Sequence, residues 1–291
     1  MNQTTGILFA LGSLVGWALG DFSIQRATRA VGRVRALFYI GASGTIGLLP
    51  FVWTEIIPPL SNPANWPLLT FASLVTFFTA LATFQGLKLG KLSVVLPIHG
   101  IELVIAILLA IAAGQEMYRP IVFGHMALVA LGLVLTSIRS FADLKRLKWE
   151  RGVAYAIAGA VGLGVTNFVV GFASREFSPL FIVWLTNLAC ALGSILIILK
   201  RSHLSCFRSD FRRHFNIIIA QCFLDNFAWI CFAYAAVLIP IGIATTVSEG
   251  YLALGALLGV LINREHLKPH QYAGVTLTLL GILAISYITA N

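Results

Sequence analysis

Two stretches of sequence decide the fold: GILFALGSLVGWALGDFSIQRATR at residues 6–29 and GVAYAIAGAVGLGVTNFVVGFASR at residues 152–175. They match each other at a constant spacing of 146 residues. The matching residues are Gly6 with Gly152, Ala10 with Ala156, Gly16 with Gly162, Asp21 with Asn167, Phe22 with Phe168 and Arg29 with Arg175. Each stretch contains about 20 mainly apolar residues, the length that crosses a bilayer as a helix. Each half of the chain is therefore predicted to start with a membrane-spanning helix.

Glycines recur at every fourth position in the first of these stretches, at Gly12, Gly16 and Gly20. This spacing places them on one face of a helix. Small residues on one face let two helix backbones approach closely in lipid. We expect these glycines to serve helix packing rather than to line a path for a substrate.

The composition of the whole chain agrees with a membrane protein. Of its 291 residues, 58% are hydrophobic and only 11% are charged, and the mean hydropathy is +0.90. Soluble domains carry about 25% charged residues, so this chain lacks the polar groups to cover a surface in water. Only helices and closed barrels satisfy their backbone groups in lipid. The apolar runs are too long and continuous for barrel strands, so the chain is predicted to be helical.

Ten apolar runs are long enough to span a membrane. We predict spans near 5–24, 34–53, 66–87, 92–113, 119–138, 151–172, 178–199, 215–237, 241–262 and 269–289. The longer connections lie near 54–65, 139–150 and 200–214, and they leave no room for a soluble domain. The first five residues carry no Lys or Arg, whereas a secretory signal peptide begins with positive charge. We therefore expect the first run to be a retained helix.

The match between the two halves continues to their ends, at a spacing of 149 residues. There Glu116 pairs with Glu265, Pro120 with Pro269 and Gly132 with Gly281. The predicted repeats are 1–145 and 146–291, with five helices each. Because five is odd, the second copy enters the membrane from the opposite side. The predicted fold is thus an all-α integral membrane protein with ten transmembrane helices in two inverted five-helix repeats, an architecture that supports alternating access.

Positive charge is distributed unevenly among the loops. Of the 20 Lys and Arg, only Arg119 and Arg175 fall in one alternate set of loops, and the others fall in the opposite set or at its helix ends. Cytoplasmic loops carry the excess of positive charge, so both termini are predicted to lie outside the cytoplasm, in a plasma or inner membrane. The charges form no single patch, which argues against nucleic-acid binding.

Four acidic residues fall within the predicted spans: Asp21, Glu102, Asp225 and Glu249. Ionisable residues inside a membrane are functional candidates by default, and no Lys or Arg lies deep in a span to neutralise these. His99, three residues before Glu102, would share its helical face. Asp21 lies close to the predicted end of its helix, where it could instead meet a loop arginine or water.

Aromatic and amide side chains accompany these acids. The further binding candidates are Trp17, Asn167, Trp184, Asn226, Trp229, Tyr234 and Tyr251. Aromatic faces beside acids suit an amine or quaternary ammonium group, although each aromatic could equally pack against lipid or a neighbouring helix. Residues 97–100, Pro-Ile-His-Gly, would weaken the fourth helix locally, and a broken helix can mark a binding site. His99 could also be a packing residue.

Several segments resemble the drug/metabolite transporter superfamily, and specifically its EamA-type members. They are residues 17–22 (WALGDF), 114–120 (GQEMYRP) and 263–269 (NREHLKP), the last two each followed by a glycine-spaced helix. The resemblance covers nearly the whole chain and implies a ten-helix transporter. Many relatives are thought to keep both termini in the cytoplasm, opposite to the charge pattern here. Glu116 and Glu265 precede helix starts, and we expect them to cap amide groups.

The predicted function is secondary-active transport of small metabolites such as amino acids or amines. Protons are the possible coupling ion. The alternative is efflux of drugs or toxic cations, and a remote one is an integral-membrane enzyme or scaffold. The sequence contains no phosphate-binding GxxxxGK[ST] loop, no HExxH and no Cys/His cluster. We therefore expect no enzymatic activity, cofactor or metal. The expected partners are a small-molecule substrate, the lipid bilayer and protons, in a monomer or homodimer.

Overall fold

The computed structural model describes residues 2–89, 98–114, 116–138, 151–200, 207–263 and 266–290. Within them, the regular structure is helical. The helices are α1 (Gln3–Val31), α2 (Arg33–Val52), α3 (Ile57–Ser61), α4 (Trp66–Leu89), α6 (Ile101–Ala112), α7 (Pro120–Ser137), α9 (Arg151–Glu176), α10 (Pro179–Lys200), α11 (Phe207–Arg213), α12 (Phe215–Leu238), α13 (Ile241–Ser248), α14 (Tyr251–Asn263) and α15 (Pro269–Ala290). Short 3₁₀ turns at Trp53–Glu55 and Pro63–Asn65 flank α3.

The described residues contain nine segments long and apolar enough to cross a membrane, one of them formed by α13 and α14 together. The shorter apolar helix α6 supplies the described part of the predicted fourth span. The ten-span architecture is thereby confirmed. The first helix continues to Val31, beyond the predicted end near residue 24. Asp21 is therefore ten residues from the helix end, and the prediction that it lies near that end is wrong.

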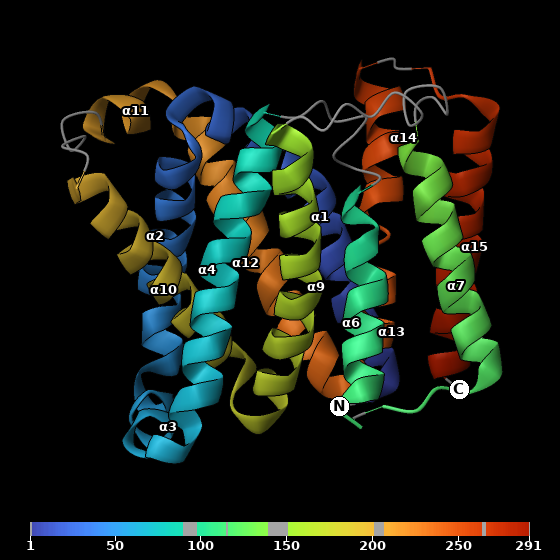
Figure 1. The fold of residues 1–291 in the computed structure, drawn as a ribbon, viewed down its shortest axis with the longest axis horizontal. Helices are drawn as coiled ribbons and strands as arrows, with labels where there is room; N and C mark the ends of the chain where they lie inside the picture. The colour runs from blue at the N-terminus through green and yellow to red at the C-terminus, as the bar shows by residue number, and fades with distance from the viewer. Residues whose placement is uncertain are drawn as a thin grey trace.

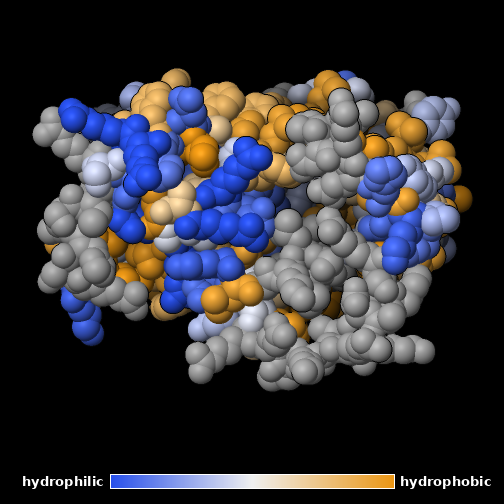
Figure 2. Space-filling view, turned by 90° about the horizontal axis from the view of Figure 1, so that it is seen from above, coloured by the Kyte–Doolittle hydropathy of each residue, from blue (hydrophilic) through white to orange (hydrophobic). Residues whose placement is uncertain are grey.

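The long helices stand side by side, and both chain termini lie at one end of the bundle (Figure 1). We call this the terminal end. The corner between α1 and α2 and the short helix α11 lie at the other end, which we call the basic end (Figure 1). Seen from above, the basic end shows a gathering of hydrophilic side chains bordered by hydrophobic ones (Figure 2). This distribution suits a bundle whose sides face lipid and whose basic end faces water.

The packing of the helices reflects the repeat. The most extensive contacts are those of α1 with α12, α4 with α9, α2 with α10, and α7 with α15. In order of spans these pairs are first with eighth, third with sixth, second with seventh, and fifth with tenth. Exchanging the two halves of the chain turns this set of pairs into itself. The two halves are therefore inverted copies related by a pseudo-twofold axis.

Equivalent glycines serve equivalent contacts in the two halves. A Cβ atom at Gly16 would lie 2.9 Å from the Ala228 Cβ of α12. A Cβ atom at Gly162, its counterpart on α9, would lie 2.3 Å from the Thr79 hydroxyl of α4. Both distances are too short for an alanine without movement of the neighbour. The packing role predicted for the glycines of the first helix is thus seen, and it extends to the second half.

The ninth span is broken, which corrects the prediction of one continuous helix over 241–262. Helix α13 ends at Ser248, and α14 begins at Tyr251 after a turn formed by Glu249 and Gly250. The Ser248 hydroxyl donates to the Ala244 carbonyl at 2.8 Å, so a side chain competes for the helix's own acceptors. In the fourth span, Gly100 forms a turn directly before α6, where the Pro-Ile-His-Gly segment predicted a weakened helix. The first part of that span, 92–97, lies outside the described residues.

Candidate functional site

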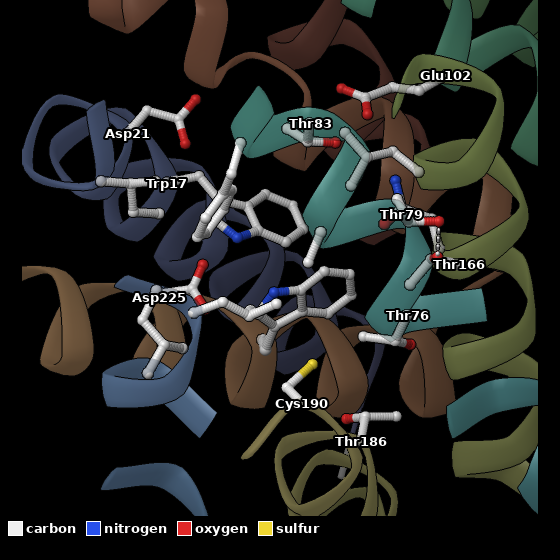
Figure 3. Close-up of a pocket in the computed structure, with 18 of the residues that line it drawn as sticks. Trp17, Asp21, Thr76, Thr79, Thr83, Glu102, Thr166, Thr186, Cys190 and Asp225 are labelled. Atoms are coloured by element: carbon white, nitrogen blue, oxygen red, sulfur yellow. Dashed lines mark hydrogen bonds between the residues drawn. The ribbon is translucent and has the colours of Figure 1, made fainter. Parts of the chain in front are cut away.

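A central cavity lies between the helices of both halves, with about 970 Å³ of space free of protein atoms, part of it open to solvent. Its described lining comes from eight helices and from the two helix breaks. The lining residues are Trp17, Asp21, Ile24, Leu37, Ile40, Thr76, Thr79, Ala80, Thr83, Phe84, Leu87, His99, Glu102, Leu163, Thr166, Asn167, Val170, Thr186, Asn187, Cys190, Asp225, Trp229, Glu249 and Tyr251. Figure 3 shows that many of these side chains point into one common space.

All four acids predicted to lie within spans line this cavity: Asp21, Glu102, Asp225 and Glu249. No Lys or Arg is among its described lining residues. A cleft lined by one sign of charge between low-dielectric walls focuses the electrostatic field. When these acids are ionised, the potential inside the cavity is therefore negative.

The two glutamates form the more deeply buried acid pair. The side chains of Glu102 and Glu249 are only 2% and 1% exposed, and their carboxyl groups lie close enough to interact. The Tyr251 hydroxyl donates to Glu102 Oε1 at 3.4 Å, and the Asn167 amide donates to Glu249 Oε1 at 3.4 Å. Both contacts are long for hydrogen bonds. Apart from the hydrogen bond that the two carboxyl groups share, the pair is thus only weakly satisfied by the described protein groups.

The two helix breaks bring these glutamates together from opposite halves of the chain. Glu102 lies in the first turn of α6, just after the Gly100 turn. Glu249 caps the C-terminal end of α13, where its amide closes the last turn on the Thr245 carbonyl. The C-terminal end of a helix attracts cations. Helix α13 therefore adds to the negative potential around Glu249.

The two aspartates form a second acid pair, which is more accessible. Asp21 on α1 and Asp225 on α12 are both half-buried. Figure 3 shows them on the same side of the cavity, with Glu102 on the opposite side. Aromatic rings share the lining with the acids: the Trp17 ring meets that of Trp229 at a centroid distance of 5.2 Å, edge to face. The cavity therefore combines two acid pairs with aromatic surface.

Two further predicted residues line the cavity beside the glutamates. His99 is 2% exposed, and its Nε2 atom has no hydrogen-bond partner in the described part of the chain. Tyr251 packs with its ring centroid 6.0 Å from that of Trp17. His99 therefore contributes an unpartnered polar atom to the lining, and Tyr251 connects Glu102 to the Trp17 ring.

Three predicted candidates lie outside the cavity lining. Asn226 accepts from the Asn187 amide at 2.8 Å and donates to the Cys222 carbonyl at 2.8 Å. Trp184 stacks on Phe181, and Tyr234 stacks on Phe9 with ring centroids 5.2 Å apart. For Trp184 and Tyr234, these contacts are the packing role that was the alternative to binding.

Sequence reasoning missed the hydroxyl side chains of the cavity. Thr76, Thr79 and Thr83 of α4 line it, together with Thr166 and Thr186 from other helices. The Thr166 hydroxyl donates to that of Thr79 at 3.4 Å. The recurrence of threonine at every third or fourth residue of α4 was the available signal, because it places three hydroxyl groups on one face of an otherwise apolar helix.

A second polar cluster lies at the terminal end, centred on Glu116. This carboxylate accepts from the backbone amides of Ile241 and Gly242, the latter at 3.0 Å, and so caps α13. It also accepts from Arg175 at 2.7 Å and from the Tyr118 hydroxyl. The predicted capping role of Glu116 is thus seen, but on a distant helix of the other half rather than on the helix that follows it. Glu265, its predicted counterpart, lies outside the described residues.

Two neighbours strengthen this cluster. The Arg175 guanidinium also donates to the Ala236 carbonyl at 2.7 Å and to the Ile239 carbonyl at 3.0 Å, at the end of α12. Burial and the adjacent Glu116 carboxylate raise the pKa of Tyr118 well above its usual range, so its hydroxyl remains a donor at neutral pH. The cluster joins the connection before α7 to the ends of α9, α12 and α13.

Comparisons with known proteins agree with this architecture. A solved crystal structure superimposes with a TM-score of 0.74 over 98% of each chain, at 16% sequence identity, which shows a shared fold. The search of curated protein sequences finds no match. The profile of the EamA-like transporter family matches residues 4–138 and again residues 150–287, once in each repeat. The chain therefore belongs to the EamA-like transporter family of the drug/metabolite transporter superfamily, and it is a multi-pass membrane transporter.

Proposed function

We propose that the protein is a secondary transporter that exchanges small organic cations for protons by alternating access. The observation that carries this proposal is the central cavity lined by four acids and by no described Lys or Arg. An amine is favoured over an anionic metabolite, because an anion would enter against this field.

The glutamate pair supports coupling to protons. Glu102 and Glu249 interact closely at a buried position, and two carboxylates that share such a site repel each other when both are ionised. A proton or a cationic substrate relieves that repulsion. Since both ions use the same carboxylates, binding of one displaces the other, which is the requirement for exchange.

The two ends of the cavity differ in a way that supports an opening at the basic end of the bundle. Its lining reaches Leu37 near the start of α2 and Leu87 near the end of α4, both close to the basic end. At the terminal end, the Glu116 cluster binds α13 to α9 and α12. With the basic end in the cytoplasm, as the loop charges predict, this conformation is open toward the cytoplasm of a plasma or inner membrane.

Transport by purified protein in liposomes tests the proposal. An imposed proton gradient should drive uptake of small amines, and Glu102→Gln or Glu249→Gln should lower the gradient-driven rate about tenfold or more, equivalent to about 1.4 kcal/mol. Asp210→Asn is the matched control, because Asp210 pairs with Arg35 at the basic end, away from the cavity. Amine uptake that ignores the gradient in all variants would refute proton exchange.

A second candidate function is efflux of bulky toxic cations. It is favoured by the aromatic residues of the described lining, which include Trp17, Trp229 and Tyr251. Overexpression in a sensitive host distinguishes the two functions. Resistance to large aromatic cations without transport of small amines would favour efflux.

A further inference from the structure

The acids of the cavity are distributed rather than gathered at one point. Asp21 interacts electrostatically with Asp225 beside it and also with Glu102 and Glu249, so the four acids act on one another across the cavity. Figure 3 shows Glu102 and Asp225 on opposite sides of the cavity. A ligand with a single positive charge can meet only one of these two ends.

Polar atoms without partners point to a ligand at the glutamate end. Within the described residues, His99 Nε2 has no hydrogen-bond partner, and Glu249 Oε2 has none outside the glutamate pair itself, although these residues are only 2% and 1% exposed. Leaving a buried polar atom unsatisfied costs about 1–3 kcal/mol. An ammonium group has three donors, and it would satisfy these acceptors together with the hydrogen-bonded oxygens of the pair.

The aromatic part of the lining suits a hydrocarbon stem. Trp17, Trp229 and Tyr251 line the same cavity as the acids, and the Trp17 ring packs against the rings of the other two. Methylene groups are buried favourably on such rings, and ring faces attract an ammonium group at either side. The cavity therefore offers apolar ring surface in addition to acids on two sides.

We propose that the substrate is a linear diamine or longer polyamine, with one ammonium at Glu102 and Glu249 and another at Asp21 and Asp225. This inference rests on the proposed cation exchange and specifies its substrate class. A diamine carries two charges and would displace two protons, one from each acid pair, so the net charge of the cavity is the same before and after exchange.

A divalent metal ion is the other ligand with two charges, and the geometry disfavours it. The described residues contain no group of three or more His, Cys, Asp and Glu placed to hold a metal ion. The two indole rings also offer a metal no ligand. The separation of the acid pairs fits two charges joined by a stem rather than two charges on one atom.

Binding to the purified full-length protein tests the inference. Putrescine and n-butylamine have the same carbon chain and differ by one ammonium group. Calorimetry should show putrescine binding about tenfold more tightly than n-butylamine, about 1.4 kcal/mol. Asp225→Asn should reduce putrescine affinity to that of n-butylamine and leave n-butylamine affinity unchanged. Glu249→Gln should weaken both.

Two controls keep the outcome interpretable. Asp225→Glu retains the negative charge. Unlike Asp225→Asn, it should therefore keep most of the preference for putrescine over n-butylamine. Asp210→Asn, which removes an acid outside the cavity, should change neither affinity. A magnesium or manganese titration measures the competing ligand directly.

The possible results separate the two proposals. Equal affinity for both amines, equal loss of both in Asp225→Asn, or binding of the metal alone would overturn the diamine inference. If n-butylamine still exchanged for protons, the proposed function would survive that result. If no amine bound or moved, both proposals would fall.

Discussion

At the scale of single residues, the contacts around each glycine decide whether it can be replaced. Gly132 of α7 faces α15 so closely that a Cβ atom there would lie 2.7 Å from the Thr278 backbone nitrogen and 2.8 Å from the Gly274 carbonyl oxygen. A backbone cannot rotate away as the end of a side chain can. Gly124 of the same helix has no such neighbour within 4 Å.

This difference predicts opposite effects of the same substitution. Gly132→Ala should destabilise the protein by about 1–3 kcal/mol, because it forces α7 and α15 apart. Gly124→Ala should be neutral or stabilising, since alanine favours a helix over glycine by about 1 kcal/mol. Thermal unfolding of the two variants in detergent measures the difference. A lower unfolding temperature for Gly124→Ala than for Gly132→Ala would contradict the described packing.

At the scale of elements, helix α13 contacts a glutamate at each end: Glu116 at its N-terminus and Glu249 at its C-terminus. Its eight residues are all buried, its N-terminal amides bind Glu116, and its C-terminal cap is Glu249. At a rise of about 1.5 Å per residue the helix spans about 12 Å. It thus links the cluster at the terminal end to the acid pair of the cavity.

Weakening the Glu116 cluster should therefore lower the stability of the folded protein more than weakening a peripheral ion pair does. Glu116→Gln removes the charge that two amides and Arg175 share, at a position whose side chain is 4% exposed. Hydrogen bonds to charged groups contribute about 1.5–3 kcal/mol each, and the partial exposure of Arg175 reduces this loss. We expect a clear decrease in unfolding temperature.

The matched comparison is Asp210→Asn, which breaks the Arg35–Asp210 pair between α2 and α11. Partly exposed pairs contribute about 0–1 kcal/mol, so this variant should unfold close to wild type. Equal decreases in the two variants would show that Glu116 is not a special support of α13.

At the scale of the whole molecule, the two ends of the bundle differ in charge, and this difference predicts the orientation in the membrane. A fluorescent protein that matures only in the cytoplasm should be dark when fused after Asn291. Fused to a chain truncated after Arg213, at the basic end, it should fluoresce. The opposite pattern would reverse the orientation and place the opening of the cavity outside the cell.

The ten spans and the inverted repeat could be predicted from the sequence, because length and hydrophobicity are local properties and the repeat is visible in the residues themselves. The break at Glu249 and Gly250 could not, since residues 241–262 read as one apolar run. The cap formed by Glu116 also escaped prediction in part. A carboxylate before a helix predicts a cap, but its distance along the chain from Ile241 hides which helix it reaches.

The candidate site divides in the same way. The sequence by itself determined that Asp21, Glu102, Asp225 and Glu249 lie in apolar spans without a neutralising cation, because charge and span length can be counted along one chain. Only the tertiary structure decided that all four face one cavity, that the glutamates pair, and that Trp184 and Tyr234 pack elsewhere. The direction of a side chain around its helix has meaning only once the neighbouring helices are in place, and those neighbours come from the other half of the chain.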